Sequence, residues 1–182
     1  MYYYDMRIVA GKYGGRTIVT PKGHHTHPMS EKMRGAMFNM LGDIEDLTVL
    51  DAYAGSGAVA IEALSRGAKH AYAIDIDVHA TGVINQNIKA LGLNKEEIKV
   101  IRANSAKWSE GNYTTNFNLV ICDPPYDDIK LSQLEKLTQN VKKDGLFILS
   151  LPSSYPRPIY EGFKLELDRH YGDGSLVFYR KI

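Results

Sequence analysis

The fold of this chain is indicated by one stretch that runs from a strand through a glycine turn into a helix: Val49-Leu50-Asp51-Ala52-Tyr53-Ala54-Gly55-Ser56-Gly57-Ala58. Gly55 and Gly57 have no Cβ, so the backbone there can pass close to a ligand. The helix that follows offers free N–H groups and the positive end of its dipole. Twenty residues after Gly55, Asp75 ends the next predicted strand, where a carboxylate can accept from both hydroxyls of a ribose. The stretch therefore predicts a nucleotide-type site at the carboxyl ends of two strands.

Strand and helix patterns alternate along the rest of the chain. Strands are predicted at 49–50, 71–74, 98–101, 117–122 and 146–151, and helices from Ser30 to about Gly42 and at 58–65, 78–91 and 129–141. The segments 163–167 and 176–179 indicate an antiparallel pair at the end, and 8–10 with 16–19 a hairpin at the start. This order predicts an α/β fold: a doubly wound, mostly parallel, seven-stranded Rossmann-like sheet with an antiparallel C-terminal strand pair and a small N-terminal β-hairpin.

Composition indicates one domain with a small extension. The chain has 182 residues, of which 44% are hydrophobic, and a formal net charge of +1. Charge is uneven, because Met1 to Arg34 holds six basic and two acidic residues, a net of +4, together with three histidines. We therefore expect residues 1–28 to form a basic hairpin and loop, and residues 29–182 the main domain.

The single cysteine, Cys122, lies in a predicted buried strand, so we expect no disulfide framework and no metal site. No window approaches the ~18 apolar residues of a membrane span. The first residues lack the pattern of a signal peptide. These features favour a cytoplasmic protein.

A second turn, Asp123-Pro124-Pro125-Tyr126, follows the apolar run 117–122. Two prolines end a strand abruptly, and the residue before them is restricted to extended conformations. The turn thus presents a carboxylate, a free backbone carbonyl and an aromatic face at the carboxyl end of a strand. Those groups suit the capture of a flat base that carries an exocyclic amine.

The glycine turn alone also fits a degenerate dinucleotide fingerprint, so nicotinamide chemistry stays open at this point. Asp51 favours another cofactor, because at the end of the first strand it would repel a pyrophosphate but suit the amino group of a methionyl moiety. The balance therefore favours S-adenosylmethionine over NAD.

Taken together, these motifs resemble one family. The basic hairpin, the segment His27-Pro28-Met29-Ser30-Glu31-Lys32-Met33-Arg34 with Phe38-Asn39-Met40-Leu41, the glycine turn and the proline turn are similar to those of the bacterial 16S rRNA guanine-N2 methyltransferases. That family belongs to the class I S-adenosylmethionine-dependent methyltransferases, and the resemblance runs from about Arg7 to Arg180. Within it, this chain departs at His27-Pro28-Met29, where the family usually has Arg-Pro-Thr, and at Gly35, where it has Glu.

The resemblance implies that residues 29–182 are a methyltransferase domain and that an exocyclic amine is methylated, with 16S rRNA or the assembled small ribosomal subunit as partner and no obligate protein partner. It implies a cofactor site formed by Asp51, Tyr53, Gly55, Ser56, Gly57, Asp75, Ile76, Asn104 and Ser105. It also implies catalytic roles for Asp123, Pro124 and Tyr126. The basic residues Arg7, Lys12, Arg16, Lys22, His27 and Arg34 are the predicted contacts to RNA.

Three other functions remain open from the sequence. An enzyme of the same chemistry could methylate adenine N6 or a glutamine amide, since these enzymes share the proline turn. A protein without catalysis could bind RNA and cofactor as an assembly factor, although it would have no use for two converging acceptors. The nucleotide that is methylated, and whether it lies in naked rRNA or in an assembled subunit, is not fixed by the sequence, and neither is the oligomeric state.

Overall fold

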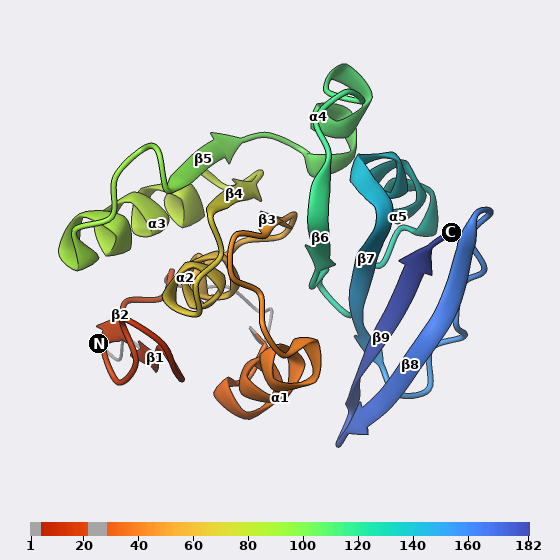
Figure 1. The fold of residues 1–182 in the computed structure, drawn as a ribbon, viewed down its shortest axis with the longest axis horizontal. Coiled ribbons are helices and arrows are strands. Elements are labelled where there is room, and N and C mark those ends of the chain that lie inside the picture. Colours follow the sequence, from red (N-terminus) through yellow and green to blue (C-terminus); the bar gives the residue numbers. More distant parts are fainter. Residues whose placement is uncertain (1–4, 22–28) are drawn as a thin grey trace.

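The computed structural model describes residues 5–21 and 29–182. Its centre is a seven-stranded sheet in the order β5-β4-β3-β6-β7-β9-β8 (Figure 1). The strands are β3 (Thr48–Asp51), β4 (His70–Asp75), β5 (Ile98–Arg102), β6 (Phe117–Cys122), β7 (Val141–Pro152), β8 (Phe163–Tyr171) and β9 (Gly174–Lys181). Strands β3 to β7 pair in parallel and β9 pairs antiparallel with both β7 and β8. The predicted fold class is confirmed.

The chain builds this sheet outward from β3, first through β4 to β5 and then back to β6 on the other side of β3. The strand order therefore reverses between β3 and β6. In doubly wound sheets ligands bind in the crevice that such a reversal leaves at the carboxyl ends of the strands. Both sequence turns, the one after β3 and the one after β6, lie at this point.

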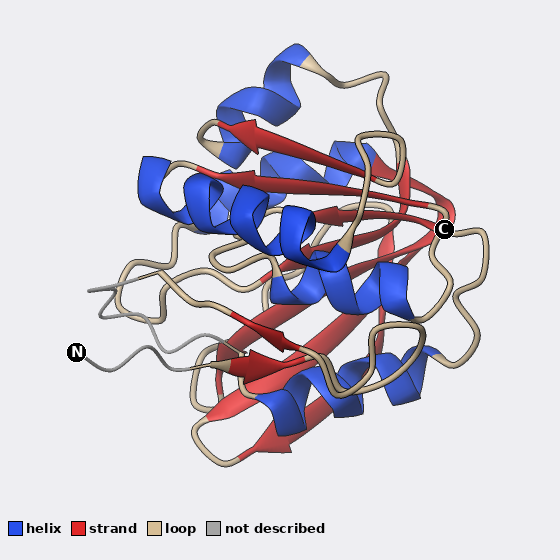
Figure 2. Cartoon of the chain, turned by 90° about the vertical axis from the view of Figure 1, so that its left-hand side faces the viewer, coloured by secondary structure: helices blue, strands red, loops and turns tan. Residues whose placement is uncertain are grey.

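Helices cover both faces of the sheet (Figure 2). The helices are α1 (Glu31–Leu41), α2 (Ala58–Ser65), α3 (Val78–Leu91), α4 (Ser105–Gly111) and α5 (Leu131–Leu137), with a short 3₁₀ helix, η1, at Thr138–Asn140. Alternate residues of β6 enter two separate cores: Leu119 and Ile121 pack with residues of α1, α2 and α3, and Val120 and Cys122 pack with residues of α5. Such alternation on a pleated strand explains why the run is continuously apolar.

Two helix starts follow capping rules that the sequence already displays. The Ser30 side chain accepts from the Met33 amide at 3.2 Å, and α1 ends at Gly42 with a φ of 71°. Asp77 caps α3 in the same way, accepting from the His79 amide at 2.7 Å. These caps satisfy backbone groups that a helix end would otherwise leave unpaired.

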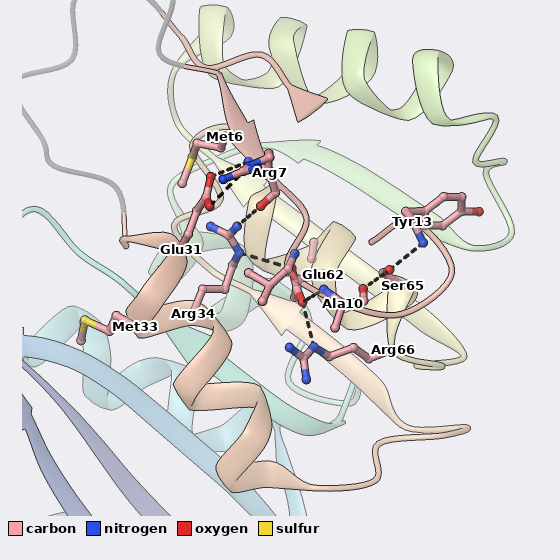
Figure 3. A network of polar contacts seen from close by, with 12 residues as sticks. Met6, Arg7, Ala10, Tyr13, Glu31, Met33, Arg34, Glu62, Ser65 and Arg66 are labelled. Atoms are coloured by element: carbon pink, nitrogen blue, oxygen red, sulfur yellow. Dashed lines mark hydrogen bonds and ion pairs between the residues drawn. The ribbon is translucent and has the colours of Figure 1, made fainter. Parts of the chain in front are cut away.

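A small antiparallel pair, β1 (Met6–Arg7) with β2 (Thr17–Ile18), lies apart from the large sheet, beside α2. The Glu62 carboxylate of α2 accepts from the amides of Val9 and Ala10 at 2.7 and 3.1 Å (Figure 3). Ser65 accepts from the Tyr13 amide and donates to the Ala10 carbonyl. The hairpin is therefore bonded to the main fold through its backbone.

The element boundaries differ from the sequence prediction in several places, among them β8 and β9, which are longer than predicted. The hairpin strands are two residues each, and β1 lies at Met6–Arg7 rather than at 8–10, where the amides of Val9 and Ala10 donate to Glu62 instead of extending the ladder. The helix predicted at 129–141 is shorter, and β7 begins at Val141, where it pairs with Phe117. Helix α4 was missed, since its seven residues are too few to display a helical period. No helix within 5–21 and 29–182 is long and apolar enough to cross a membrane.

Candidate functional site

One cleft of about 580 Å³ opens where the strand order reverses. Its walls come from the glycine turn after β3, the end of β4, the start of α4 and the turn after β6. The volume lies within the range of sites that bind small molecules and cofactors, ~300–1,000 Å³. The cleft thus brings the two motifs singled out in the sequence into one site.

The two glycines of the first turn have different roles. Gly55 has a φ of 53°, lines the cleft, and has open space where a Cβ would lie. A ligand can approach its backbone there. Gly57 has a φ of 79° and begins α2, and a Cβ there would lie 3.1 Å from Ile84. Gly57 therefore allows α2 to begin and to pack closely against Ile84, while Gly55 and Ser56 border the cleft.

The end of β4 supplies an acceptor and an apolar surface. The two oxygens of Asp75 accept from the amides of Gly55 and Asp77 at 2.8 and 2.9 Å, which fixes the carboxylate at the cleft wall. Ile76, the next residue, is 66% exposed and lines the same cleft. An exposed isoleucine beside a fixed carboxylate suits an adenine ring beside its ribose.

A smaller hollow of about 50 Å³ continues past Asp75, between the ends of β4 and β5. Tyr53, Asn104 and Ser105 line it. Asn104 caps α4, accepting from the Lys107 amide at 3.0 Å, and Ser105 is buried. The predicted cofactor residues from Tyr53 to Ser105, except Gly57, therefore line two adjacent hollows that share Tyr53, Asp75, Ile76 and Asn104.

Asp51 does not line the cleft, so the structure gives no support to the predicted contact with a cofactor amino group. It is 1% exposed, and its carboxylate accepts from the amide of Ala60, in the first turn of α2, at 3.1 Å. Burial raises the pKa of Asp51 to about 7. The aspartate is a buried helix cap, a role that a residue at the end of a strand before a helix takes equally well.

The turn after β6 presents its carboxylate to the cleft. Asp123, Pro124 and Tyr126 all line it. Asp123 accepts from the Met29 amide at 3.0 Å, and burial raises its pKa to about 6, against the opposing effects of contacts with Ser150 and Met29. Pro124 is buried, whereas the Tyr126 ring is 39% exposed. The turn therefore holds an acceptor at the wall and an aromatic face at the mouth.

Sequence reasoning missed residues that reach the cleft from the N-terminal segment. Met6 of β1 and Met29, just before α1, both line the cleft. The Met6 sulfur lies 3.7 Å from the Ser56 hydroxyl of the glycine turn. The sequence carries one usable signal, that Met29 stands beside the motif residue Pro28. Nothing in the sequence places Met6 there, because the contact depends on how the hairpin packs.

Three of the predicted RNA contacts, Arg7, Lys12 and Arg16, are exposed on the hairpin. The prediction for Arg34 is wrong. Arg34 is 0% exposed, its guanidinium donates to the Arg7 carbonyl, and its Nε lies 3.6 Å from the Glu62 carboxylate (Figure 3). A side chain enclosed in this way does not reach RNA. Two further predicted contacts, Lys22 and His27, lie outside the described residues.

Known proteins that are similar to this chain include named methyltransferases. The model of the conserved hypothetical protein 95 family matches residues 6–180. A candidate rRNA methyltransferase of Bacillus subtilis, YlbH, is 36% identical over 97% of this chain and 99% of its own length. Ribosomal RNA small subunit methyltransferase D of Haemophilus influenzae is 29% identical over 97% of this chain and 94% of its own. The solved structure of a candidate methyltransferase of Escherichia coli, yhhF, superposes with a TM-score of 0.86 at 26% identity, over 97% of this chain and 98% of its own.

The family model covers nearly the whole chain, and these relatives are named as methyltransferases. The chain belongs to the conserved hypothetical protein 95 family and is a methyltransferase with the class I fold.

Proposed function

We propose that this protein transfers the methyl group of S-adenosylmethionine to the exocyclic N2 amine of a guanine in 16S rRNA. The observation that carries the proposal is the shared cleft: a glycine turn with a fixed carboxylate at one end, and the Asp123–Tyr126 turn at the other. The first half suits a nucleoside cofactor and the second half a flat base. The rRNA substrates in the names of the relatives support the choice of acceptor.

The residues of the cleft fit the cofactor. Asp75 would accept from the ribose hydroxyls, Ile76 would pack against the adenine, and the open backbone at Gly55 would lie beside the methionine end. When bound, the sulfonium supplies an activated methyl group. The protein's own part is to hold the acceptor in line with that group and to exclude other orientations, which contributes ~7–11 kcal/mol in favourable cases.

The proline turn would direct the amine. The Asp123 carboxylate and the Pro124 carbonyl accept the two amine hydrogens, which turns the nitrogen lone pair towards the methyl group. Both acceptors also stabilise the positive charge that develops on nitrogen. Tyr126 stacks on the base after it leaves its helix, a contact worth ~1–3 kcal/mol in other complexes. No stronger base is required, because the methylated amine is acidic and releases its proton readily.

The hairpin would hold the RNA. Arg7, Lys12 and Arg16 are exposed on an element that also contributes Met6 to the cleft. Arg7 follows Met6 in β1, so a phosphate bound at Arg7 would lie beside the entrance for the base. The proposed acceptor is 16S rRNA, either free or within the small subunit, and its methylation would take place in the cytoplasm.

The test is transfer of labelled methyl groups to small subunits or 16S rRNA that lack the modification, followed by mass spectrometry of the nucleosides. N2-methylguanosine is the expected product. N6-methyladenosine would keep the chemistry and overturn the acceptor. No label in the presence of measurable cofactor binding would refute the rRNA assignment.

Replacing the carboxylate tests the assigned chemistry directly. Asp123→Ala should abolish turnover, because the amine loses one of two acceptors, while the affinity for S-adenosylmethionine by calorimetry stays nearly unchanged. Asp43→Ala, an exposed aspartate before β3, is the matched control and should behave as wild type. Retained turnover in Asp123→Ala would contradict the role of Asp123.

A further inference from the structure

The hydroxyl of Tyr126 is held by a residue outside its own turn. It lies 2.9 Å from the hydroxyl of Ser150, which is on β7 and 1% exposed. Ser150 also lies near the Asp123 carboxylate, where its hydroxyl acts to lower the carboxyl pKa. One buried hydroxyl thus joins the aromatic ring and the carboxylate of the same turn.

The donors in this cluster can be assigned from the groups themselves. An ionised carboxylate only accepts hydrogen bonds, so towards Asp123 the Ser150 hydroxyl can act only as the donor. The Ser150 oxygen then accepts, and Tyr126 donates to it. Tyr126 and Ser150 are thus joined at 2.9 Å, and Ser150 acts on the Asp123 carboxylate as a donor that lowers its pKa, with the Met29 amide as a second donor at 3.0 Å.

The neighbouring strand leaves room for this arrangement. Gly174 begins β9, and a Cβ there would lie 2.6 Å from the Tyr126 hydroxyl. The backbone of Gly174 is not in the left-handed region, so glycine is not required for its conformation. The absence of a side chain at Gly174 therefore serves the position of the tyrosine.

The surroundings of Ser150 indicate that its hydroxyl serves the cleft and not the packing of β7. Its neighbours on β7, Leu149 and Leu151, are fully buried apolar side chains that form the core. A buried hydroxyl in such a strand costs free energy unless it is hydrogen-bonded. The bonds it makes are to the two groups that the proposed reaction needs to be fixed.

We propose that Ser150 is a positioning residue of the methyl-transfer site, which sets the Tyr126 ring and the Asp123 carboxylate relative to each other through one hydroxyl, in a space that Gly174 keeps free. The catalytic role of Ser150 rests on the proposed function. The arrangement of Tyr126, Ser150 and Asp123 does not depend on that function. No covalent step passes through Ser150.

The first test removes the hydroxyl. Ser150→Ala should lower kcat for methyl transfer roughly 10- to 100-fold, the range expected when reacting groups shift by about 1 Å. The affinity for S-adenosylmethionine should stay within about twofold, because Ser150 does not line the cofactor part of the cleft. The matched control is Ser109→Ala, which removes another fully buried hydroxyl, bonded to the Lys136 carbonyl and the Asn140 side chain away from the cleft.

The pH dependence separates positioning from loss of stability. Ser150 donates to the ionised form of Asp123, so its removal should raise the carboxyl pKa from about 6 and move the acidic limb of kcat/KM to higher pH. Asp51, Cys122 and Tyr126 are the other titratable groups that face this carboxylate. Asp51 has a pKa of about 7, so carbon-13 NMR titration of the individual carboxyl signals should assign the shift to Asp123.

A second pair of variants tests the space at Gly174. Gly174→Ala should displace the Tyr126 ring and lower kcat. Tyr126→Phe removes the oxygen that the new methyl group would strike. Gly174→Ala should therefore cost clearly less in the Tyr126→Phe background than in the wild type.

Two results would overturn the inference: a Ser150→Ala protein whose kinetics and Asp123 titration match those of Ser109→Ala, or a Gly174→Ala change that is equally harmful in both backgrounds. Failure of the proposed function would look different. The wild-type protein would then leave rRNA unlabelled, while the NMR titration of Asp123 would still report on Ser150.

Discussion

The N-terminal segment uses charge in opposite ways on its inner and outer faces. On the inner face Arg34 and Glu62 are fully buried, with Nε and a carboxylate oxygen 3.6 Å apart. On the outer face Arg7 and Glu31 form an ion pair at 3.9 Å whose side chains are 69% and 40% exposed. A basic residue in a segment predicted to bind RNA is therefore not necessarily available to RNA. Burial decides whether the cation fixes the fold or remains available for phosphates.

The largest effect should come from the inner face. Arg34→Ala leaves Glu62 buried without one of its cations, and removing one partner of a buried pair typically costs ~3–5 kcal/mol. The loss is moderated because Arg66 still donates to Glu62 at 2.8 Å. Urea denaturation followed by circular dichroism measures the free energy of unfolding.

Arg7→Ala is the matched control for this measurement, since its exposed pair should contribute no more than ~1 kcal/mol. Equal losses for Arg34→Ala and Arg7→Ala would show that burial does not separate the two faces. RNA affinity measured on the remaining folded Arg34→Ala protein should change little.

The hairpin turn offers a second, smaller contrast within a few residues. Gly11 and Gly15 have nearly the same φ, 81° and 80°, but a Cβ on Gly11 would lie 1.8 Å from the Ser65 carbonyl oxygen, while Gly15 faces open space. Gly15→Ala should cost only the backbone strain, ~1–2 kcal/mol. Gly11→Ala adds the clash and should cost more, by ~1–3 kcal/mol.

The same denaturation series measures both glycine variants. Hydrogen exchange at the Lys12 amide, which donates to the Ser65 carbonyl at 2.7 Å, reports whether the hairpin separates from α2. Exchange should accelerate in Gly11→Ala well beyond Gly15→Ala. Similar exchange in the two variants would mean that the contact with Ser65 does not hold the hairpin.

The sequence predicts the parts of this molecule that local chemistry determines. Helix α3 begins and ends where Asp77 and Gly92 indicate, and β6 is an apolar run closed by two prolines. The carboxylates Asp75 and Asp123 could be placed at the carboxyl ends of strands for the same reason. Their meeting in one cleft follows from the strand order, which the alternation of strands and helices implies.

The parts that the sequence did not predict depend on contacts between distant residues. Arg34 is 28 positions from Glu62, and neither residue type predicts burial. Asp51 fits a cofactor contact and a helix cap equally well from its position, and only the exposed fraction distinguishes them. Ser150 and Gly174 are ordinary strand residues until the turn after β6 is seen to lie against them.

The smallest effects should come from single charges on the outer face, and they are the most specific test of its role. Replacing Lys12 by Gln should reduce the slope of log affinity for RNA against log salt by ~0.7–0.9, the value for one phosphate contact. The free energy of unfolding should be unchanged, because the Lys12 side chain is exposed. Arg7→Gln and Arg16→Gln should each do the same, with the slopes measured by fluorescence anisotropy.

Lys69→Gln and Lys95→Gln provide the control, since these exposed lysines precede β4 and β5, at the ends of the strands opposite the cleft. They should leave the slope unaltered. If all five substitutions reduced the slope equally, attraction to RNA would depend on overall charge, and the outer face of the hairpin would have no special part in it. A reduction confined to Arg7, Lys12 and Arg16 would place the phosphates along the hairpin. They would then run from Arg7, whose neighbour Met6 lines the cleft, to Lys12, whose amide bonds to Ser65 at the far end of α2.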